Sequence, residues 1–281
     1  MAAITMSLLT SNSLMSRNSL LGRSALVSRG ASISRNFLMG RNSFMGRGAL
    51  QSLHSLSFLP NPGTCVLCDT SSGRQLDLCP GCEADLPWVL ASDAPCRYCG
   101  EPDTTTDICH QCQLHRPAND GFATAFRYEF PIDIMVQGFK TGQLAFGRVL
   151  AQLLASRTAL QATSLVPVPL ARKRKRQRGF NQAQVIASVL AQHHSVPLLD
   201  IVSASPTSEQ KALSARQRQR NVKGAFSITD AMPLNGRHLT VIDDVYTTGA
   251  TTRELALTLK RQGAAAVNIL TLARTPIHNS P

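Results

Sequence analysis

All eight cysteines of the chain fall in four CxxC pairs, which is its clearest chemical pattern. The pairs CVLC, CPGC, CRYC and CHQC supply Cys65, Cys68, Cys79, Cys82, Cys96, Cys99, Cys109 and Cys112. A CxxC turn places two thiolates on one side of a tight loop, which suits two corners of a zinc tetrahedron. Four thiolates leave no open position for water, so the pattern predicts one or two structural zinc ions rather than a catalytic one.

The spacing leaves the zinc pairing open. The simplest assignment is sequential, with the first two pairs on one ion and the last two on another, but an interleaved arrangement also fits. CPGC alone suits a redox motif, although no βαβ pattern surrounds it, and four disulfides would need an oxidising compartment. We expect His110 and His115 to be bystanders because the cysteines already suffice.

A second chemical pattern is DDVYTTGATT, residues 243–252. Two adjacent acids, Asp243 and Asp244, can hold sugar hydroxyls or a hydrated Mg²⁺. A Thr/Gly turn that opens a helix presents N–H groups and hydroxyls to an anion, and the helix dipole adds to the attraction. The turn residues are Thr247, Thr248, Gly249, Ala250 and Thr251. Because neither a Walker A loop nor a GxGxxG loop is present, we expect another kind of phosphate site.

A third pattern is the basic run ARKRKRQR at 171–178, which precedes GFNQA. It could be a nucleic-acid patch, a nuclear address, a solvated charged face or part of a ligand pocket. Since it follows the strand-like SLVPVPL, we predict a loop at the carboxyl end of a strand, where open α/β sheets bind ligands. A second basic cluster lies at 216–223, and a hood over the site, a nucleic-acid contact and an exposed flank all remain open for it.

The elements that must position these motifs follow from apolar spacing. LTVI at 239–242 is typical of a buried strand, and RELALTLKRQ at 253–262 is typical of a helix with one apolar face. SLVPVPL at 164–170 and FNQAQVIASVLAQ at 180–192 predict another strand and helix. Both phosphate-binding candidates therefore lie between a strand and a helix.

The net charge of +12 is unevenly distributed. Residues 1–64 contain six arginines, no lysine and no acid, and the arginines recur every six residues from Arg17 to Arg47. This period matches neither a helix nor a heptad, so we expect residues 1–60 to be disordered or a misassigned extension, with a transit peptide as the alternative. Elsewhere the chain is nearly neutral apart from the basic run, which disfavours a protein that coats DNA. No apolar stretch is long enough to span a membrane.

Together these motifs resemble the ComF/GntX family, bacterial proteins linked to natural competence and the use of DNA. The CxxC pairs, VPVPL followed by RGFNQ, QKALSARQRQRNVKGAF and VIDDVYTTGATT carry the resemblance over about residues 62–275. The last segment also resembles the phosphoribosyl pyrophosphate (PRPP) motif of type I phosphoribosyltransferases, with Thr240 as a small departure. The resemblance implies an α/β fold, a type I phosphoribosyltransferase-like parallel sheet with helices on both faces over 119–281, preceded by a double zinc ribbon over 61–118.

The resemblance also implies roles for single residues. The 5′-phosphate of PRPP would lie in Thr247–Thr251, and Asp243 and Asp244 would act on the ribose as the catalytic pair. Arg174 and Arg178 would face the pyrophosphate, and Mg²⁺ would accompany PRPP. The expected location is the bacterial cytoplasm.

Three functions are compatible with these motifs. The first is a PRPP-binding protein that acts in DNA uptake or use. The second is an active phosphoribosyltransferase on a small nitrogenous acceptor; every cysteine belongs to a CxxC pair, so an amidophosphoribosyltransferase is matched only in its PRPP half. The third is a non-enzymatic adaptor for single-stranded DNA or competence proteins, which the 5% aromatic content disfavours. The oligomeric state stays open.

Overall fold

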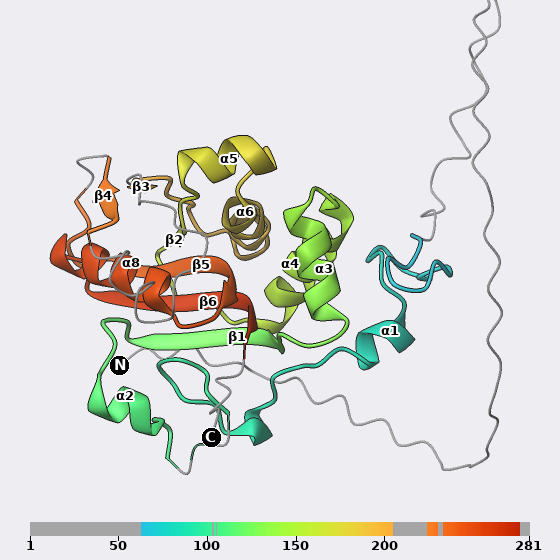
Figure 1. The fold of residues 1–281 in the computed structure, drawn as a ribbon, viewed down its shortest axis with the longest axis horizontal. Coiled ribbons are helices and arrows are strands. Elements are labelled where there is room, and N and C mark those ends of the chain that lie inside the picture. The colour runs from blue at the N-terminus through green and yellow to red at the C-terminus, as the bar shows by residue number, and fades with distance from the viewer. Residues whose placement is uncertain (1–62, 103, 105, 205–223, 230–232, 276–281) are drawn as a thin grey trace, which may run out of the picture. The chain divides into compact units, whose positions relative to one another are not determined.

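The computed structural model describes residues 63–102, 104, 106–204, 224–229 and 233–275 (Figure 1). The predictions for residues 1–60 and for the basic cluster at 216–223 lie outside these ranges. Fourteen elements are described, in chain order α1 (Pro80–Ala84), η1 (Ala91–Asp93), α2 (His110–Leu114), β1 (Gly121–Arg127), α3 (Ile132–Lys140), α4 (Leu144–Arg157), β2 (Ser164–Pro167), α5 (Arg172–Arg178), α6 (Gln182–His194), β3 (Val202–Ala204), β4 (Phe226–Ile228), β5 (His238–Tyr246), α8 (Ala250–Arg261) and β6 (Ala266–Arg274).

Four parallel strands form the main sheet in the order β1-β6-β5-β2. The central strand β6 is an almost continuous apolar run because both of its faces are buried. Leu270 and Leu272 join the core that contains α3, α4 and α6, whereas Val267 and Ile269 join the core that contains α8. Alternate side chains of a strand point to opposite faces, so these helices cover both faces of the sheet.

One close contact fixes the packing of α3 against α4. A Cβ on Gly147 of α4 would overlap the Phe139 ring of α3, so the absence of a side chain lets the two helices approach each other. Phe139 is fully buried there. A separate antiparallel pair, β3 and β4, lies beside the main sheet (Figure 1).

The two cysteine ribbons belong to different hydrophobic cores of the fold. The first, with α1, lies beside α3 and α4, and the second, with α2, lies below β1 (Figure 1). Cys65 and Leu78 accordingly belong to the α4 core, and Cys96 and Cys112 to the α8 core. Between the ribbons, the Val89 N–H donates to the carbonyl of Ala125 at 2.9 Å, which adds this segment to the free edge of β1.

Three local expectations need correction. The basic run at 171–178 is the helix α5 rather than a loop, because Arg, Lys and Gln are good helix formers and Gly179 ends it in the left-handed region. The strand predicted at 239–242 extends as β5 through both acids, since β6 continues to pair with it. α8 begins at Ala250 rather than at 253, with Gly249 as its N-cap.

The predicted fold class is confirmed: a parallel α/β sheet carries helices on both faces and follows a small zinc-ribbon module. The described residues, from 63 to 275, belong to one compact unit, and the boundary proposed near residue 118 stays a prediction. In the described ranges, no helix is both long enough and apolar enough for a bilayer.

Candidate functional site

The cysteines gather in two groups of four, in the sequential arrangement. Within each group the sulfur atoms lie within 4.8 Å of one another. The Cys68 and Cys79 sulfurs are 3.8 Å apart, and those of Cys99 and Cys109 are 3.6 Å apart. A zinc tetrahedron with Zn–S bonds of about 2.3 Å has edges of roughly 3.8 Å, so both groups fit structural zinc. His110 and His115 are in neither group, as expected.

Crowding of the second group separates the acidities of its thiols. The Cys112 thiol lowers the pKa of Cys96, whereas the pKa of Cys112 itself is raised by Cys96, by Cys99 and by burial. Ionisation of one thiol therefore opposes ionisation of Cys112 when no cation lies among them. Zinc binding must release protons, and its affinity must fall as the pH falls.

Two adjacent acids on β5 form the centre of the second site. The Asp244 N–H donates to Asp243 Oδ1 at 2.9 Å, and the Val245 N–H donates to Asp244 Oδ1 at 2.7 Å. Lys140 Nζ lies 3.0 Å from Asp244 Oδ2. The backbone thus fixes the direction of both carboxylates, and the last residue of α3 supplies a cation beside them.

Asp243 has an unusual proton affinity. Its pKa is raised well above the ordinary value, first by burial and then by the charge of Asp244, while Lys140 opposes the shift. Such a carboxylate is a strong hydrogen-bond acceptor, and perturbed carboxyl groups are concentrated at functional sites.

The predicted phosphate turn directly follows these acids. Gly249 adopts a φ of 72°, which favours glycine. The Ala250 N–H donates to Thr248 Oγ1 at 3.4 Å, so one N–H group at the start of α8 already has a hydroxyl partner. Thr247 is exposed, and Thr251 is half-buried in the first turn of α8.

A buried tyrosine lies directly beneath this turn. Tyr246 is 2% exposed, and a Cβ on Gly249 would collide with its hydroxyl. Its ring meets Phe122 of β1 edge to face, with ring centroids 4.6 Å apart. Burial raises the pKa of Tyr246 to about 12, so the hydroxyl keeps its proton at neutral pH. The turn therefore lies on a buried, closely packed side chain.

The RGFNQ motif, residues 178–182, connects α5 to α6. Arg178 Nη1 donates to Gln182 Oε1 at 3.1 Å. Asn181 Oδ1 accepts from the Ala183 N–H as the cap of α6, and its Nδ2 donates to the carbonyl of Val168. The Phe180 ring lies 5.5 Å from that of Phe139, which precedes Lys140. Three side chains of the motif thus hold Arg178 and join its loop to α3.

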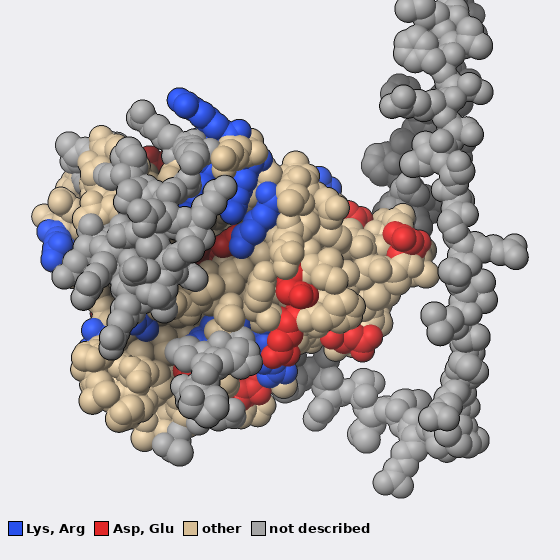
Figure 2. Space-filling view, viewed as in Figure 1, with Lys and Arg blue, Asp and Glu red and all other residues tan. Residues whose placement is uncertain are grey.

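Parallel pairing brings the basic helix to the same sheet edge as the acids. Pro167 of β2 pairs with Ile242 of β5, and the Val168 N–H donates to the carbonyl of Ile242 at 2.9 Å. The acids follow on β5, while the chain after β2 leads into α5. Figure 2 shows blue basic side chains gathered over α5, with a small red acidic spot recessed beside them. Arg174, Lys175 and Arg176 are exposed and Arg178 is half-buried.

Sequence reasoning missed Lys140. It lies 104 positions before Asp244, and the pairing arises only when α3 packs beside β5. A lone lysine at the end of a helix gives no local signal, although it falls in a segment that fits the ComF/GntX resemblance.

Comparison with known sequences identifies relatives that span most of the chain. Residues 57–113 match the family described as Double zinc ribbon domain. The DNA utilization protein YhgH of Escherichia coli K12 is 32% identical over 225 residues, which are 76% of this chain and 91% of the relative. Competence protein F of Haemophilus influenzae is 32% identical over 70% of this chain and 90% of its own. Competence protein ComFC of Bacillus subtilis is 25% identical over 75% of this chain and 95% of its own.

Among solved structures, the glutamine PRPP amidotransferase of B. subtilis aligns with 43% of this chain at a TM-score of 0.32 and 19% identity. This chain spans 25% of that enzyme. A purine phosphoribosyltransferase from Pyrococcus horikoshii aligns with 54% of this chain and 76% of its own, at a TM-score of 0.28 and 17% identity. The sequence relatives decide the assignment: the chain belongs to the ComF/GntX family.

Proposed function

We propose that the chain binds PRPP, or a related phosphorylated sugar, at the carboxyl edge of its sheet and does so in the uptake or use of DNA. The observation that carries this proposal is the order of chemical groups along the segment that leads from β5 into α8. Two oriented carboxylates on β5 lead directly into an exposed turn over the start of α8. The names of the relatives, which refer to DNA utilization and competence, support the biological setting.

Each end of PRPP would meet groups of matching chemistry. The N–H groups that open α8 would hold the 5′-phosphate, helped by the helix dipole. Asp243 and Asp244 would accept hydrogen bonds from the ribose hydroxyls, with Lys140 fixing Asp244. Arg174 and Arg178 would face the pyrophosphate, which would arrive as its Mg²⁺ complex.

The same arrangement would support transfer of the phosphoribosyl group to a nitrogenous acceptor. Departure of pyrophosphate builds negative charge on the leaving group, which Arg178 would stabilise, while Asp243 would stay close to the cationic sugar. Incubation with PRPP and candidate amines or bases, with pyrophosphate release as the readout, would separate an enzyme from a PRPP-binding protein.

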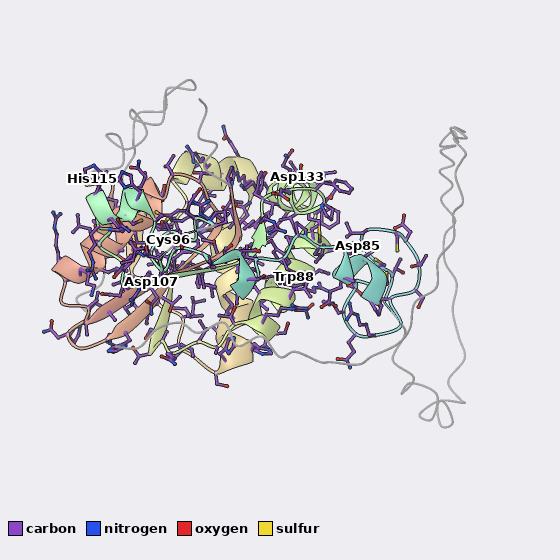
Figure 3. The ribbon with its side chains drawn as sticks, turned by 90° about the horizontal axis from the view of Figure 1, so that it is seen from below. Asp85, Trp88, Cys96, Asp107, His115 and Asp133 are labelled. Carbon is purple, nitrogen blue, oxygen red and sulfur yellow. The ribbon has the colours of Figure 1, made fainter. Side chains whose placement is uncertain are left out.

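Calorimetric titration of PRPP with Mg²⁺ into the zinc-loaded chain tests the binding proposal. Asp244→Asn removes one carboxylate charge and frees Lys140, so we expect the heat of binding to disappear. Asp107→Asn is the charge-matched control, because Asp107 is an exposed residue of the second ribbon (Figure 3) that pairs with Arg97. Equal PRPP binding by the parent, Asp244→Asn and Asp107→Asn would mean that PRPP binds elsewhere on the chain. No binding by the parent would refute the proposal.

The exposed basic face of α5 favours a second candidate function, contact with single-stranded DNA. Arg174, Lys175 and Arg176 project from one short helix, and phosphate contacts of this kind weaken steeply with salt. Charge reversal of Lys175 and Arg176 to Glu should reduce both the affinity for a fluorescent oligonucleotide and the salt slope. If the affinity does not change, α5 serves only the small ligand.

A further inference from the structure

Arg253 of α8 connects the second cysteine group to the phosphate turn. Its Nε donates to Tyr246 Oη at 3.1 Å, and its Nη2 lies 4.0 Å from Cys112 Sγ. Tyr246 lies beneath Gly249, so a continuous series of contacts runs from a zinc-ligand sulfur to the turn.

The rest of the second ribbon is held firmly on the same face. Arg274, at the end of β6, is 3% exposed; its Nε donates to the carbonyl of Cys99 at 2.6 Å, and its guanidinium pairs with Glu101. Asn119 Nδ2 donates to the carbonyl of Tyr98 at 3.0 Å. The ribbon therefore cannot move without disturbing the floor of the turn.

The charges explain why an arginine is needed here. Four thiolates around one Zn²⁺ carry a net charge of about −2, which would repel an anion bound at the nearby turn. The guanidinium of Arg253 lies between these two places and donates to both partners. Only a planar group with several donors can do this from one position.

We propose that Arg253 is a positioning residue through which zinc in the second ribbon sets the conformation of the phosphate turn. Zinc in the first ribbon should have no such role, because Cys65 of that ribbon belongs to the core of α3, α4 and α6, whereas Cys112 and Tyr246 belong to the core of α8. The link itself stands on the contacts of Arg253; only its consequence for ligand affinity rests on the proposed function.

Two readouts on the full, zinc-loaded chain without PRPP test this link. Hydrogen–deuterium exchange reports on the backbone of residues 245–252, and release of zinc to a colorimetric chelator reports on each ribbon. Arg253→Met should accelerate exchange at the turn and speed zinc release from the second site about tenfold or more, as expected on loss of a group that contacts a ligand.

Two conservative variants separate positioning from a general loss of stability. Arg253→Lys keeps the charge but cannot reach both partners, so zinc retention should recover while exchange at the turn stays fast. Tyr246→Phe should accelerate exchange at the turn and leave zinc release unchanged. A merely structural role would instead move both readouts together in every variant.

Variants of the ligands provide the matched control. Cys96→Ser should accelerate exchange at 245–252, whereas Cys68→Ser, in the first ribbon, should not. Equal acceleration by the two, or parent-like exchange in a folded Arg253→Met protein, would overturn the proposal. Titration of PRPP is read separately, so its failure in the parent protein would remove the proposed function and leave this link to be decided by exchange and zinc release.

Discussion

Asp243 occupies a position that costs stability. Its pKa is raised in the folded state, first by burial and then by Asp244, so between the unfolded and folded pKa values the folded chain binds more protons. The free energy of unfolding must therefore fall as the pH rises from about 4 towards the folded pKa. Asp243→Asn should be more stable than the parent at pH 7, because it removes the cost of ionising a buried carboxyl beside Asp244, and it should lose PRPP binding.

Urea unfolding at several pH values measures this difference. The gap between Asp243→Asn and the parent should shrink towards pH 4, where the wild-type carboxyl is protonated. Asp244→Asn is the control: its free energy of unfolding should be lower than that of the parent, because the substitution breaks the ion pair with Lys140. An Asp243→Asn protein that is less stable at pH 7 would contradict this expectation and would mean that the hydrogen bond from the Asp244 N–H outweighs the cost of burial.

Gly249 is subject to two constraints, a positive φ and a close neighbour, and comparison with Gly236 separates them. Its φ of 72° disfavours any side chain, and a Cβ would also collide with the Tyr246 hydroxyl. Gly236 has a similar φ of 75° but open space around its Cβ position. Gly236→Ala should cost about 1 kcal/mol of stability, and Gly249→Ala more, with loss of PRPP binding. Equal costs in thermal unfolding would mean that Tyr246 moves aside.

At the scale of elements, the cap of α6 connects stability to the site. Asn181→Ala removes the bond to the Ala183 N–H and the bond to the Val168 carbonyl, so we expect a loss of about 1 kcal/mol and weaker PRPP binding through Arg178. Ser188→Ala, on the exposed part of the same helix, should change neither. Thermal unfolding and calorimetry read the two effects, and an unchanged affinity would separate the cap from the site.

Local patterns made some elements predictable and hid others. The CxxC pairs and the Thr/Gly turn after two acids are short-range signals, so the zinc ligands and the loop before α8 are predictable from sequence. Which pairs share an ion stays open in the sequence, and the fold makes the grouping sequential. The basic run at 171–178 follows a strand-like segment and precedes a helical one, so its position indicates a loop, whereas the helix propensity of Arg, Lys and Gln makes it α5. Lys140 and Arg253 gain their partners only through packing of distant segments, which no spacing rule reports.

At the scale of the whole molecule, the two ribbons join different hydrophobic cores and should respond separately to zinc removal. The chain's single tryptophan, Trp88, follows the first ribbon (Figure 3). Its ring centroid lies 4.5 Å from that of Phe126, and the guanidinium of Arg157 lies 3.8 Å from it. Arg157 also contacts Glu83 of α1, at 3.6 Å, so the environment of Trp88 depends on the first ribbon.

Loss of zinc from the first site should therefore expose Trp88 and shift its fluorescence to longer wavelength. We expect this shift on chelation of the parent protein and, before any chelator is added, in Cys68→Ser. Cys96→Ser should keep the parent spectrum while it loses order at the phosphate turn. Because Trp88 reports on one ribbon and the turn on the other, the two signals would show whether zinc leaves the sites independently. Simultaneous loss of both signals in either variant would mean that the ribbons and the sheet unfold as one cooperative unit.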